Sequence, residues 1–297
     1  MNLSSLSIAA TLTAVLAVFV LRHSSSVSPS DQSHQHGTFV PIAADVFRLS
    51  YSWHIPWLGV WAPVHVLLAS FGKDYVLFDA GAPGREYADF LLPRLETALG
   101  DGQLRLIALT HGHSDHVGAL EALVQKYPDV QVVFHQDEAP YITGQFPYDS
   151  LPSDHDKFNV TMFDIDVSSA LSEERVLHVR GSSRDVADAF RPSGCASDVG
   201  WLPPRGALHF HHAPGHAPGL VAYLHKGSGS AIVGDIVHQL GDPPVVDTSH
   251  FGFTSKLTQS TLSAKALAAL DFDVAFPVHD SAAGVTKRAL QDWAQQA

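Results

Sequence analysis

The sequence has little cysteine and little positive charge, and each shortage excludes a class of protein. Its 297 residues include one cysteine, Cys195, so no intramolecular disulfide can form and the fold cannot depend on such bridges. Lysine and arginine number 18 against 30 aspartates and glutamates, which leaves a formal net charge of −12. Because proteins that bind nucleic acids need basic patches to contact phosphates, we expect no nucleic acid partner.

Long apolar runs are also scarce, and the run at the N-terminus is short. Residues 8–21 are apolar apart from two threonines and carry no charge. This length fits the core of a signal peptide better than a membrane span, although no lysine or arginine precedes it. We expect residues 1–23 to be a signal peptide or a membrane anchor and residues 24–38 to be a linker. The protein would then be secreted or associated with a membrane; a buried N-terminal helix is the alternative.

The remaining residues, 39–297, are enough for one large domain with an ample core. Apolar runs that predict strands alternate with amphipathic runs that predict helices. The expected strands are residues 39–51, 64–68, 75–79, 104–109, 130–134, 207–211, 220–224, 231–235 and 274–278. The expected helices are residues 86–99, with a kink or break at Pro93, 117–126, 256–270 and 283–294. This alternation predicts a layered α/β sandwich with an irregular insertion at about residues 141–205.

Three histidines and an aspartate are crowded into six residues directly after the predicted strand 104–109. The sequence His-Gly-His-Ser-Asp-His contains His111, His113, Asp115 and His116. Imidazole and carboxylate groups together are the ligands of zinc, and catalytic groups of α/β folds gather on loops at the carboxyl ends of strands. We expect a loop here rather than a helix, because ligands on one helical face prefer spacings of three or four.

Three further candidate ligands follow in similar contexts. His216 lies between two turns that contain proline and glycine, Asp235 follows Ile-Val-Gly, and His279 follows Phe-Pro-Val. This ordered set resembles the metallo-β-lactamase superfamily, whose motif is His-x-His-x-Asp-His. The resemblance covers about residue 40 to the C-terminus. It implies a four-layer αββα sandwich with mixed sheets.

The resemblance also implies two zinc ions per chain. The implied ligands of the first ion are His111, His113 and His216. The implied ligands of the second ion are Asp115, His116 and His279. Asp235 would bridge both ions, and Asp79, in Asp-Ala-Gly after the predicted hairpin, would orient a metal-binding histidine. A hydroxide shared by the two ions would attack a carbonyl carbon, with Asp79, Asp115 and Asp235 as the candidate catalytic carboxylates.

The aspartate at position 235 narrows the expected substrate. Cysteine-containing β-lactamases of this family have cysteine at the equivalent position, and other dinuclear β-lactamases usually lack the bridging aspartate. Thioesterases such as glyoxalase II and lactonases have it. We therefore expect hydrolysis of a small-molecule thioester, lactone or related ester. The alternatives are β-lactam hydrolysis, a mononuclear iron dioxygenase of the persulfide type, and a non-catalytic protein that retains a metal.

Aromatic residues are candidates for a substrate pocket. The early tryptophans would form either an apolar wall for substrate or ordinary packing. They are Trp53, Trp57 and Trp61. The candidates from the irregular segment are Phe146, Tyr148 and Trp201.

Overall fold

The computed structural model describes most of the chain after residue 36. The described residues are 37–55, 60–148, 166–172, 174–190, 200–240, 245–247, 254, 256–279 and 284–297. The expected signal peptide or anchor, Trp57 and Cys195 lie outside them, so those predictions stay predictions. Within the described ranges, no helix combines the length and the apolar character that crossing a membrane requires.

Seven strands form the first sheet, in the order β1-β2-β3-β4-β5-β6-β7. They are β1 (Val40–Ala43), β2 (Val46–Ile55), β3 (Val60–Phe71), β4 (Asp74–Phe78), β5 (Gln103–Ala108), β6 (Gln131–His135) and β7 (Val176–Val179). Pairing is antiparallel from β1 to β4 and parallel from β4 to β7, so the sheet is mixed. Every residue of β6 is buried, as expected for a parallel strand covered on both faces.

Six strands form the second sheet, in the order β15-β14-β11-β10-β9-β8. They are β8 (Ser183–Asp185), β9 (Leu208–His212), β10 (Val221–His225), β11 (Ser230–Gly234), β14 (Val274–Pro277) and β15 (Val285–Thr286). Only β11 and β14 are parallel among these pairs, so this sheet is also mixed. A separate pair consists of β12 (His238–Leu240) and β13 (Val245–Asp247).

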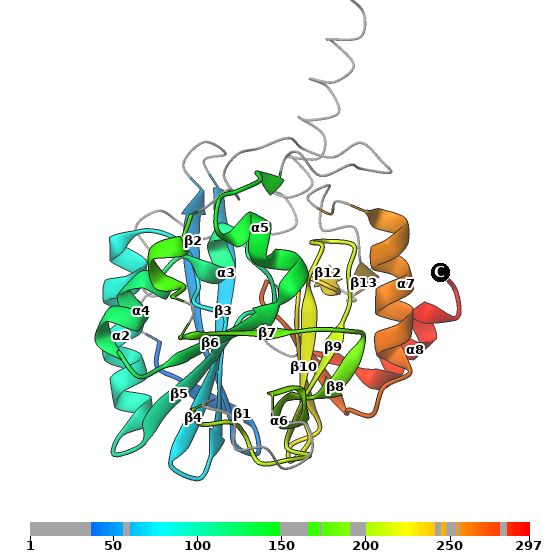
Figure 1. Cartoon of the computed structure of the whole chain (residues 1–297). Helices are drawn as coiled ribbons and strands as arrows, with labels where there is room; N and C mark the ends of the chain where they lie inside the picture. The colour runs from blue at the N-terminus through cyan, green and yellow to red at the C-terminus, as the bar shows by residue number, and fades with distance from the viewer. Residues whose placement is uncertain are drawn as a thin grey trace, which may run out of the picture.

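Helices cover the outer face of each sheet. The first part of the chain contains α2 (Arg85–Leu99), α3 (Ser114–Val117), α4 (Leu120–Lys126) and α5 (Ala139–Ile142). The later helices are α6 (Val186–Phe190), α7 (Leu257–Ala268) and α8 (Lys287–Ala294). Figure 1 shows α2 and α4 on one side, α7 and α8 on the other, and the two sheets between them. This is the predicted four-layer αββα sandwich.

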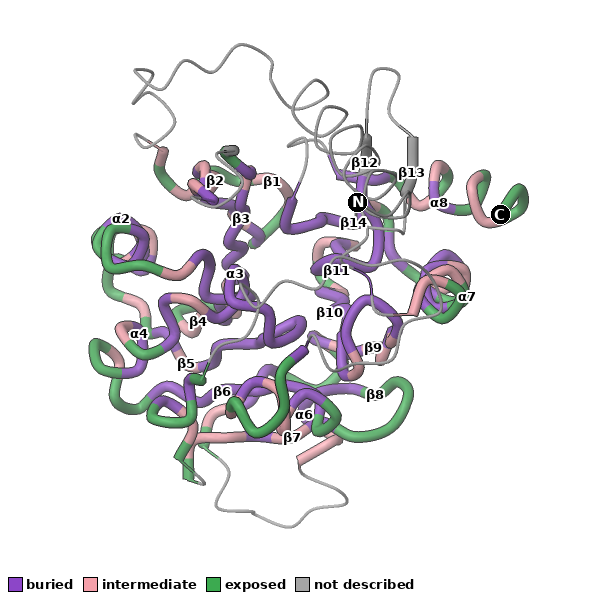
Figure 2. The backbone as a smooth tube through the Cα atoms, turned by 90° about the horizontal axis from the view of Figure 1, so that it is seen from above, coloured by how far each residue is buried: buried purple, intermediate pink, exposed green. Residues whose placement is uncertain are grey.

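The core has three parts that correspond to the spaces between these layers. One lies between the first sheet and α2 and α4, one lies between the sheets, and one lies between the second sheet and α7 and α8. Phe78 and Tyr223 meet across the central space with ring centroids 5.6 Å apart. Seen along the layers in Figure 2, buried backbone fills the middle and the exposed helical surfaces face outward.

The predicted helix 117–126 is interrupted, because α4 begins only at Leu120. The amide of Gly118 donates to the carbonyl of Gly81 at 2.8 Å instead of continuing the helical hydrogen bonds. A Cβ on Gly118 would overlap the backbone of Ala82 and Pro83, so the chain can approach this closely only with glycine. Asp115 and His116 lie on the single turn α3 and not on the expected loop, because the Val117 amide donates to the carbonyl of His113 at 3.2 Å.

Two other helices differ from their predictions, α2 in its interior and α8 at its start. Helix α2 runs from Arg85 to Leu99 with Pro93 inside it, so of the kink or break expected there the break is absent. Helix α8 begins at Lys287 rather than in the segment before it, because Val285 and Thr286 pair with β14 as β15. The Thr286 hydroxyl then accepts a hydrogen bond from the amide of Ala289 at 3.2 Å, which caps the helix.

Candidate metal centre

The seven candidate ligands follow the carboxyl ends of four strands. The motif residues follow β5, His216 follows β9, Asp235 follows β11 and His279 follows β14. Since β11 and β14 are parallel neighbours, Asp235 and His279 leave their sheet at the same edge. The exit of β5 is joined to the second sheet by a hydrogen bond from the Val221 amide to the Thr110 carbonyl, 2.9 Å long. The two sheets therefore bring all four strand exits together.

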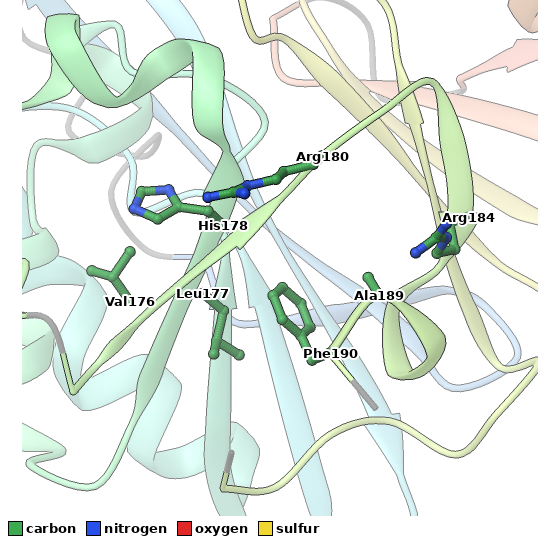
Figure 3. Close-up of a pocket in the computed structure, with 7 residues that line it drawn as sticks. All are labelled: Val176, Leu177, His178, Arg180, Arg184, Ala189 and Phe190. Atoms are coloured by element: carbon green, nitrogen blue, oxygen red, sulfur yellow. The ribbon is translucent and has the colours of Figure 1, made fainter. Parts of the chain in front are cut away.

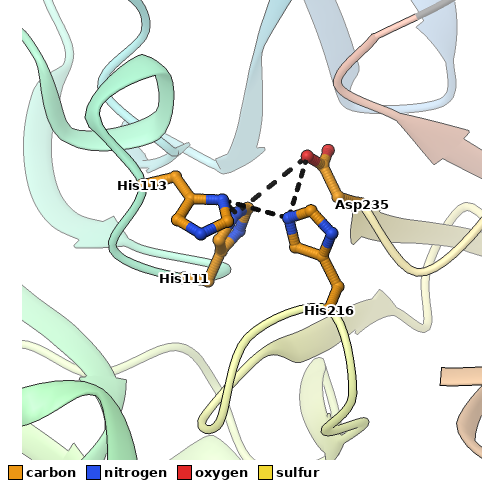
Figure 4. Close-up of side chains that lie close together, drawn as sticks. All are labelled: His111, His113, His216 and Asp235. Atoms are coloured by element: carbon orange, nitrogen blue, oxygen red, sulfur yellow. Dashed lines mark hydrogen bonds and ion pairs between the residues drawn. The ribbon is translucent and has the colours of Figure 1, made fainter. Parts of the chain in front are cut away.

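The first group of ligand atoms consists of three histidines and Asp235, which point toward one another in Figure 4. His111 Nε2 and His113 Nδ1 lie 2.9 Å apart, and His113 Nδ1 and His216 Nε2 lie 3.0 Å apart. All four side chains are buried. Imidazole nitrogens and a carboxylate converging in this way offer a set of donors suited to a divalent cation such as zinc.

The second group consists of Asp115, His116 and His279. His279 Nε2 lies 3.1 Å from Asp115 Oδ2. Two buried atoms, His116 Nε2 and Asp115 Oδ1, have no hydrogen-bond partner among the described residues. Because buried polar atoms are nearly always satisfied, a cation at this position would account for both.

Asp235 lies between the two groups. Its Oδ2 atom is 3.4 Å from His216 Nε2 and 4.0 Å from His111 Nε2 in the first group. The same oxygen is 3.5 Å from His116 Nε2 and 3.7 Å from His279 Nε2 in the second group. One carboxylate oxygen thus faces histidines of both groups, which is the arrangement that a bridging ligand requires.

Asp79 supports the second group from behind. This residue directly follows β4, has φ of 60° in the left-handed region, and is fully buried. Its Oδ1 accepts a hydrogen bond from the Thr110 amide at 2.7 Å, and its Oδ2 lies 2.9 Å from His116 Nδ1. A carboxylate behind an imidazole fixes the ring and leaves the opposite nitrogen facing the site.

Two other histidines are oriented through their far nitrogen in the same way. His279 Nδ1 donates to the carbonyl of Pro63 at 2.7 Å. His216 Nδ1 lies 3.3 Å from the hydroxyl of Thr254. Their Nε2 atoms are therefore directed inward, toward Asp235.

Glycines allow the close packing of the loops that carry His216 and Asp235. Gly234 has φ of +51°, and a Cβ there would lie 2.6 Å from the Thr110 hydroxyl oxygen. Gly215 has φ of +139°, and a Cβ there would overlap the backbone of Ser260 on α7. Neither position accommodates a larger residue without a shift of the backbone or of a group packed against it.

Burial and charge divide the histidines into two sets. Burial holds the pKa of His111 and of His216 well below the usual range and lowers the pKa of His113 to about 4. Burial opposes protonation of His116 and His279 as well, but nearby carboxylates, Asp235 first, outweigh it. They raise the pKa of His116 well above its usual range and that of His279 to about 9. The carboxylates of Asp235 and Asp115 thus act on both histidines of the second group.

The aromatic candidates have different surroundings. Tyr148 is buried and lies edge-on to His113, with ring centroids 4.6 Å apart. Trp201 does not belong to a pocket at the site: it contacts Phe71, at the opposite end of the β3–β4 hairpin from Asp79. Phe146 is 50% exposed. Trp53 is buried in the core, and Trp61 is exposed beside His54.

Glu138 is a residue of the site that the sequence prediction missed. It is fully buried, and its carboxylate accepts hydrogen bonds from the amides of Gly112 and Gly219, next to the ligand loops. Burial raises the pKa of Glu138 although these hydrogen bonds and one from Tyr148 oppose the shift. The one available signal was an acidic residue shortly after the end of β6.

A cavity of about 430 Å³ lies elsewhere, among β7, β8 and α6. Figure 3 shows the side chains that line it. They are Val176, Leu177, His178, Arg180, Arg184, Ala189 and Phe190. None of them is a candidate ligand, so this cavity is separate from the seven converging side chains.

Comparison with known proteins agrees with the geometry. The chain is 28% identical over 195 residues to the probable metallo-hydrolase YybB of Bacillus subtilis, covering 66% of this chain and 70% of that protein. It is 27% identical over 161 residues to the hydroxyacylglutathione hydrolase GloC of Haemophilus influenzae, covering 54% and 60%. The fold is similar to that of the metallo-beta-lactamase FIM-1 from Pseudomonas aeruginosa in its mono-zinc form. The TM-score is 0.53 at 16% identity, covering 87% of this chain and 95% of that one.

The sequence model of the metallo-beta-lactamase superfamily matches residues 59–183 and 199–279. These two segments include all seven candidate ligands and Asp79. The chain therefore belongs to the metallo-beta-lactamase superfamily and is a metal-dependent hydrolase.

Proposed function

We propose that this chain is a dinuclear zinc hydrolase that cleaves a thioester, a lactone or a related ester. The observation that carries the proposal is the position of Asp235 Oδ2, which lies within 4.0 Å of four histidine Nε2 atoms drawn from both groups. The ligands would be His111, His113 and His216 for one ion and Asp115, His116 and His279 for the other, with Asp235 shared. When bound, two such cations lower the pKa of a water molecule toward neutrality and polarise the carbonyl of an ester.

The side chains of this protein would contribute orientation and charge. Asp79 holds His116 by its Nδ1 atom, and the Pro63 carbonyl holds His279 in the same way. Because these contacts are made to buried groups, the ligands need little rearrangement to bind cations. Asp115 and Asp235 place two carboxylates beside His116 and His279, which offsets the positive charge of the ions.

The substrate class rests on Asp235 and on one relative. An aspartate that faces both groups supports the thioesterase and lactonase interpretation over β-lactam hydrolysis. GloC, whose name denotes a hydrolase of hydroxyacylglutathione, supports the thioester class in particular. A mononuclear iron dioxygenase of the persulfide type would use a subset of the same ligands, and metal analysis distinguishes it, because it would show iron content and oxygen uptake instead of zinc and hydrolysis.

The test combines metal analysis with a hydrolysis panel of S-lactoylglutathione, a homoserine lactone, an aryl ester and a cephalosporin. We expect about two zinc ions per chain and turnover of the thioester or the lactone. Asp235→Asn should lower kcat by about 10²- to 10³-fold, the usual effect of losing one preorganised electrostatic group. Asp89→Asn, on the exposed surface of α2, is the matched control and should hydrolyse like the wild type.

The outcomes separate the two parts of the proposal. A zinc-loaded protein that is inactive on all four substrates would refute the substrate class and leave the metal assignment standing. Unchanged turnover in Asp235→Asn would refute the shared site itself.

A further inference from the structure

Glu138 joins the two loops that carry the histidines of the first group. It lies at the start of α5, and none of its side chain is exposed. Its Oε2 accepts a hydrogen bond from the Gly112 amide at 3.0 Å, and its Oε1 accepts one from the Gly219 amide at 2.6 Å. Gly112 stands between His111 and His113, and Gly219 follows His216 by three residues. One carboxylate thus spans the two loops.

The carboxylate is held without a cationic partner among the described residues. Its third hydrogen bond comes from the hydroxyl of Tyr148, which donates to Oε2. A buried carboxylate is costly unless hydrogen bonds stabilise it, so these three donors must keep their positions for Glu138 to stay there. The dependence is mutual, because the two loop amides are themselves fixed by the carboxylate.

Glycine is required on both sides of this contact. A Cβ on Gly219 would lie 2.7 Å from the Glu138 amide nitrogen. A Cβ on Gly112 would lie 3.2 Å from Glu138 Oε2 and would overlap the Tyr148 hydroxyl. The close approach of the three segments is therefore built into the sequence at both loops.

Tyr148 extends the contact to a ligand side chain. Its ring meets His113 edge-on at 4.6 Å while its hydroxyl is bound to Glu138. The ring restricts the rotation of His113, whose Nδ1 lies 3.0 Å from His216 Nε2 on the other loop. Glu138 acts on the first group both through the backbone and through this ring.

We propose that Glu138, with Tyr148, is a positioning residue for the first metal site alone: it fixes the loop of His111 and His113 relative to the loop of His216. The inference rests on the proposed function for the existence of the two sites. The second group has separate supports, Asp79 behind His116 and the Pro63 carbonyl behind His279. Loss of Glu138 should therefore weaken one zinc equivalent and spare the other.

The experiment is a zinc titration of the metal-free full chain by calorimetry, for the wild type, Glu138→Gln, Glu138→Ala and Tyr148→Phe. We expect one of two equivalents to bind about 10- to 100-fold more weakly in Glu138→Ala, the range seen when a supporting partner of a metal ligand is lost. Glu138→Gln should recover part of the affinity, since an amide oxygen still accepts one glycine N–H. Tyr148→Phe keeps the ring against His113 and should show a smaller loss.

Controls separate positioning from general destabilisation. Glu121→Gln, at an exposed carboxylate of α4, should bind both equivalents as the wild type does. Thermal unfolding of each metal-free variant reports the structural cost on its own. A purely structural role, with lower unfolding temperatures and two unchanged zinc affinities in Glu138→Ala and Glu138→Gln, would overturn the proposal. Equal weakening of both equivalents would overturn its restriction to the first site.

The affinity readout also distinguishes this inference from the proposed function. A wild-type chain that binds two zinc ions but hydrolyses none of the substrates contradicts only the substrate class. A wild-type chain that binds no zinc contradicts both.

Discussion

Asp79 and Asp45 share an uncommon backbone conformation, with φ of 60° and 59°, but only Asp79 is buried. A non-glycine residue in this region costs of order 1 kcal/mol, although aspartate tolerates it better than most residues. Asp79 offsets the cost with hydrogen bonds to Thr110 and to His116. The strain therefore falls on the residue whose carboxylate orients a candidate ligand.

We predict that Asp79→Asn weakens zinc binding at one equivalent by about 10- to 100-fold. The amide has no charge, and its NH2 group cannot accept the hydrogen bonds that one carboxylate oxygen accepts now. The measurement is a calorimetric zinc titration of the metal-free protein.

Asp45→Asn is the matched control, because it makes the same chemical change in the same backbone conformation at an exposed turn. It should leave both zinc affinities unchanged. Equal losses in the two variants, or no loss in either, would show that Asp79 does not support a ligand.

At the scale of elements, the β9–β10 loop depends on its contact with α7. Gly215→Ala places a methyl group against the backbone of Ser260 at φ of +139°, a conformation that alanine rarely adopts. We predict a loss of about 1–3 kcal/mol in the free energy of unfolding, together with reduced zinc content because His216 is the next residue. Urea denaturation and elemental analysis check the two effects.

Gly206→Ala separates backbone strain from the loss of packing. Gly206 has φ of +78° with no atom within 4 Å of an added Cβ. The Gly206→Ala substitution should lower the free energy of unfolding by about 1 kcal/mol or less and leave the zinc content unchanged. If Gly215→Ala behaves the same way, the contact with α7 does not position His216.

Most strands and helices could be predicted because their apolar patterns are strong and local. The interruption between α3 and α4 could not, because it depends on a hydrogen bond between Gly118 and Gly81, which are far apart in sequence. The start of α8 was predicted too early for a similar reason, because Val285 belongs to strand β15 only through its pairing with Ala275 of β14. Local propensity carries no information about either partner.

At the scale of the whole molecule, the site depends on how the two sheets are held together. The Tyr223 hydroxyl, from β10 in the second sheet, donates to the Leu109 carbonyl at the end of β5 in the first. We predict that Tyr223→Phe lowers the free energy of unfolding by about 1–1.5 kcal/mol, because it removes one buried hydrogen bond and keeps the ring. Urea denaturation of the metal-free protein measures this.

Tyr75→Phe is the control for Tyr223→Phe. The Tyr75 hydroxyl makes no hydrogen bond within the described residues, so its loss should change stability by less than about 0.5 kcal/mol. A similar loss of stability in both variants would mean that the hydrogen bond between Tyr223 and Leu109 contributes little to the free energy of unfolding.

The candidate ligands could be predicted from the sequence. The residues that orient these ligands could be predicted only in part. The resemblance named the seven ligands and Asp79 because the motif residues are recognisable in order. Glu138 was not recognisable, since its partners Gly112 and Gly219 are 26 and 81 residues away. Trp201 was assigned to a pocket on its residue type alone, and the fold places it against Phe71 instead.

The most direct test of the dinuclear site is a stepwise zinc titration of the metal-free wild type, with binding and thioester or lactone hydrolysis followed in the same samples. Two groups of ligands that share Asp235 predict two bound equivalents, with full hydrolysis reached only after the second. Saturation at a single equivalent with full activity, or hydrolysis that persists without zinc, would contradict it.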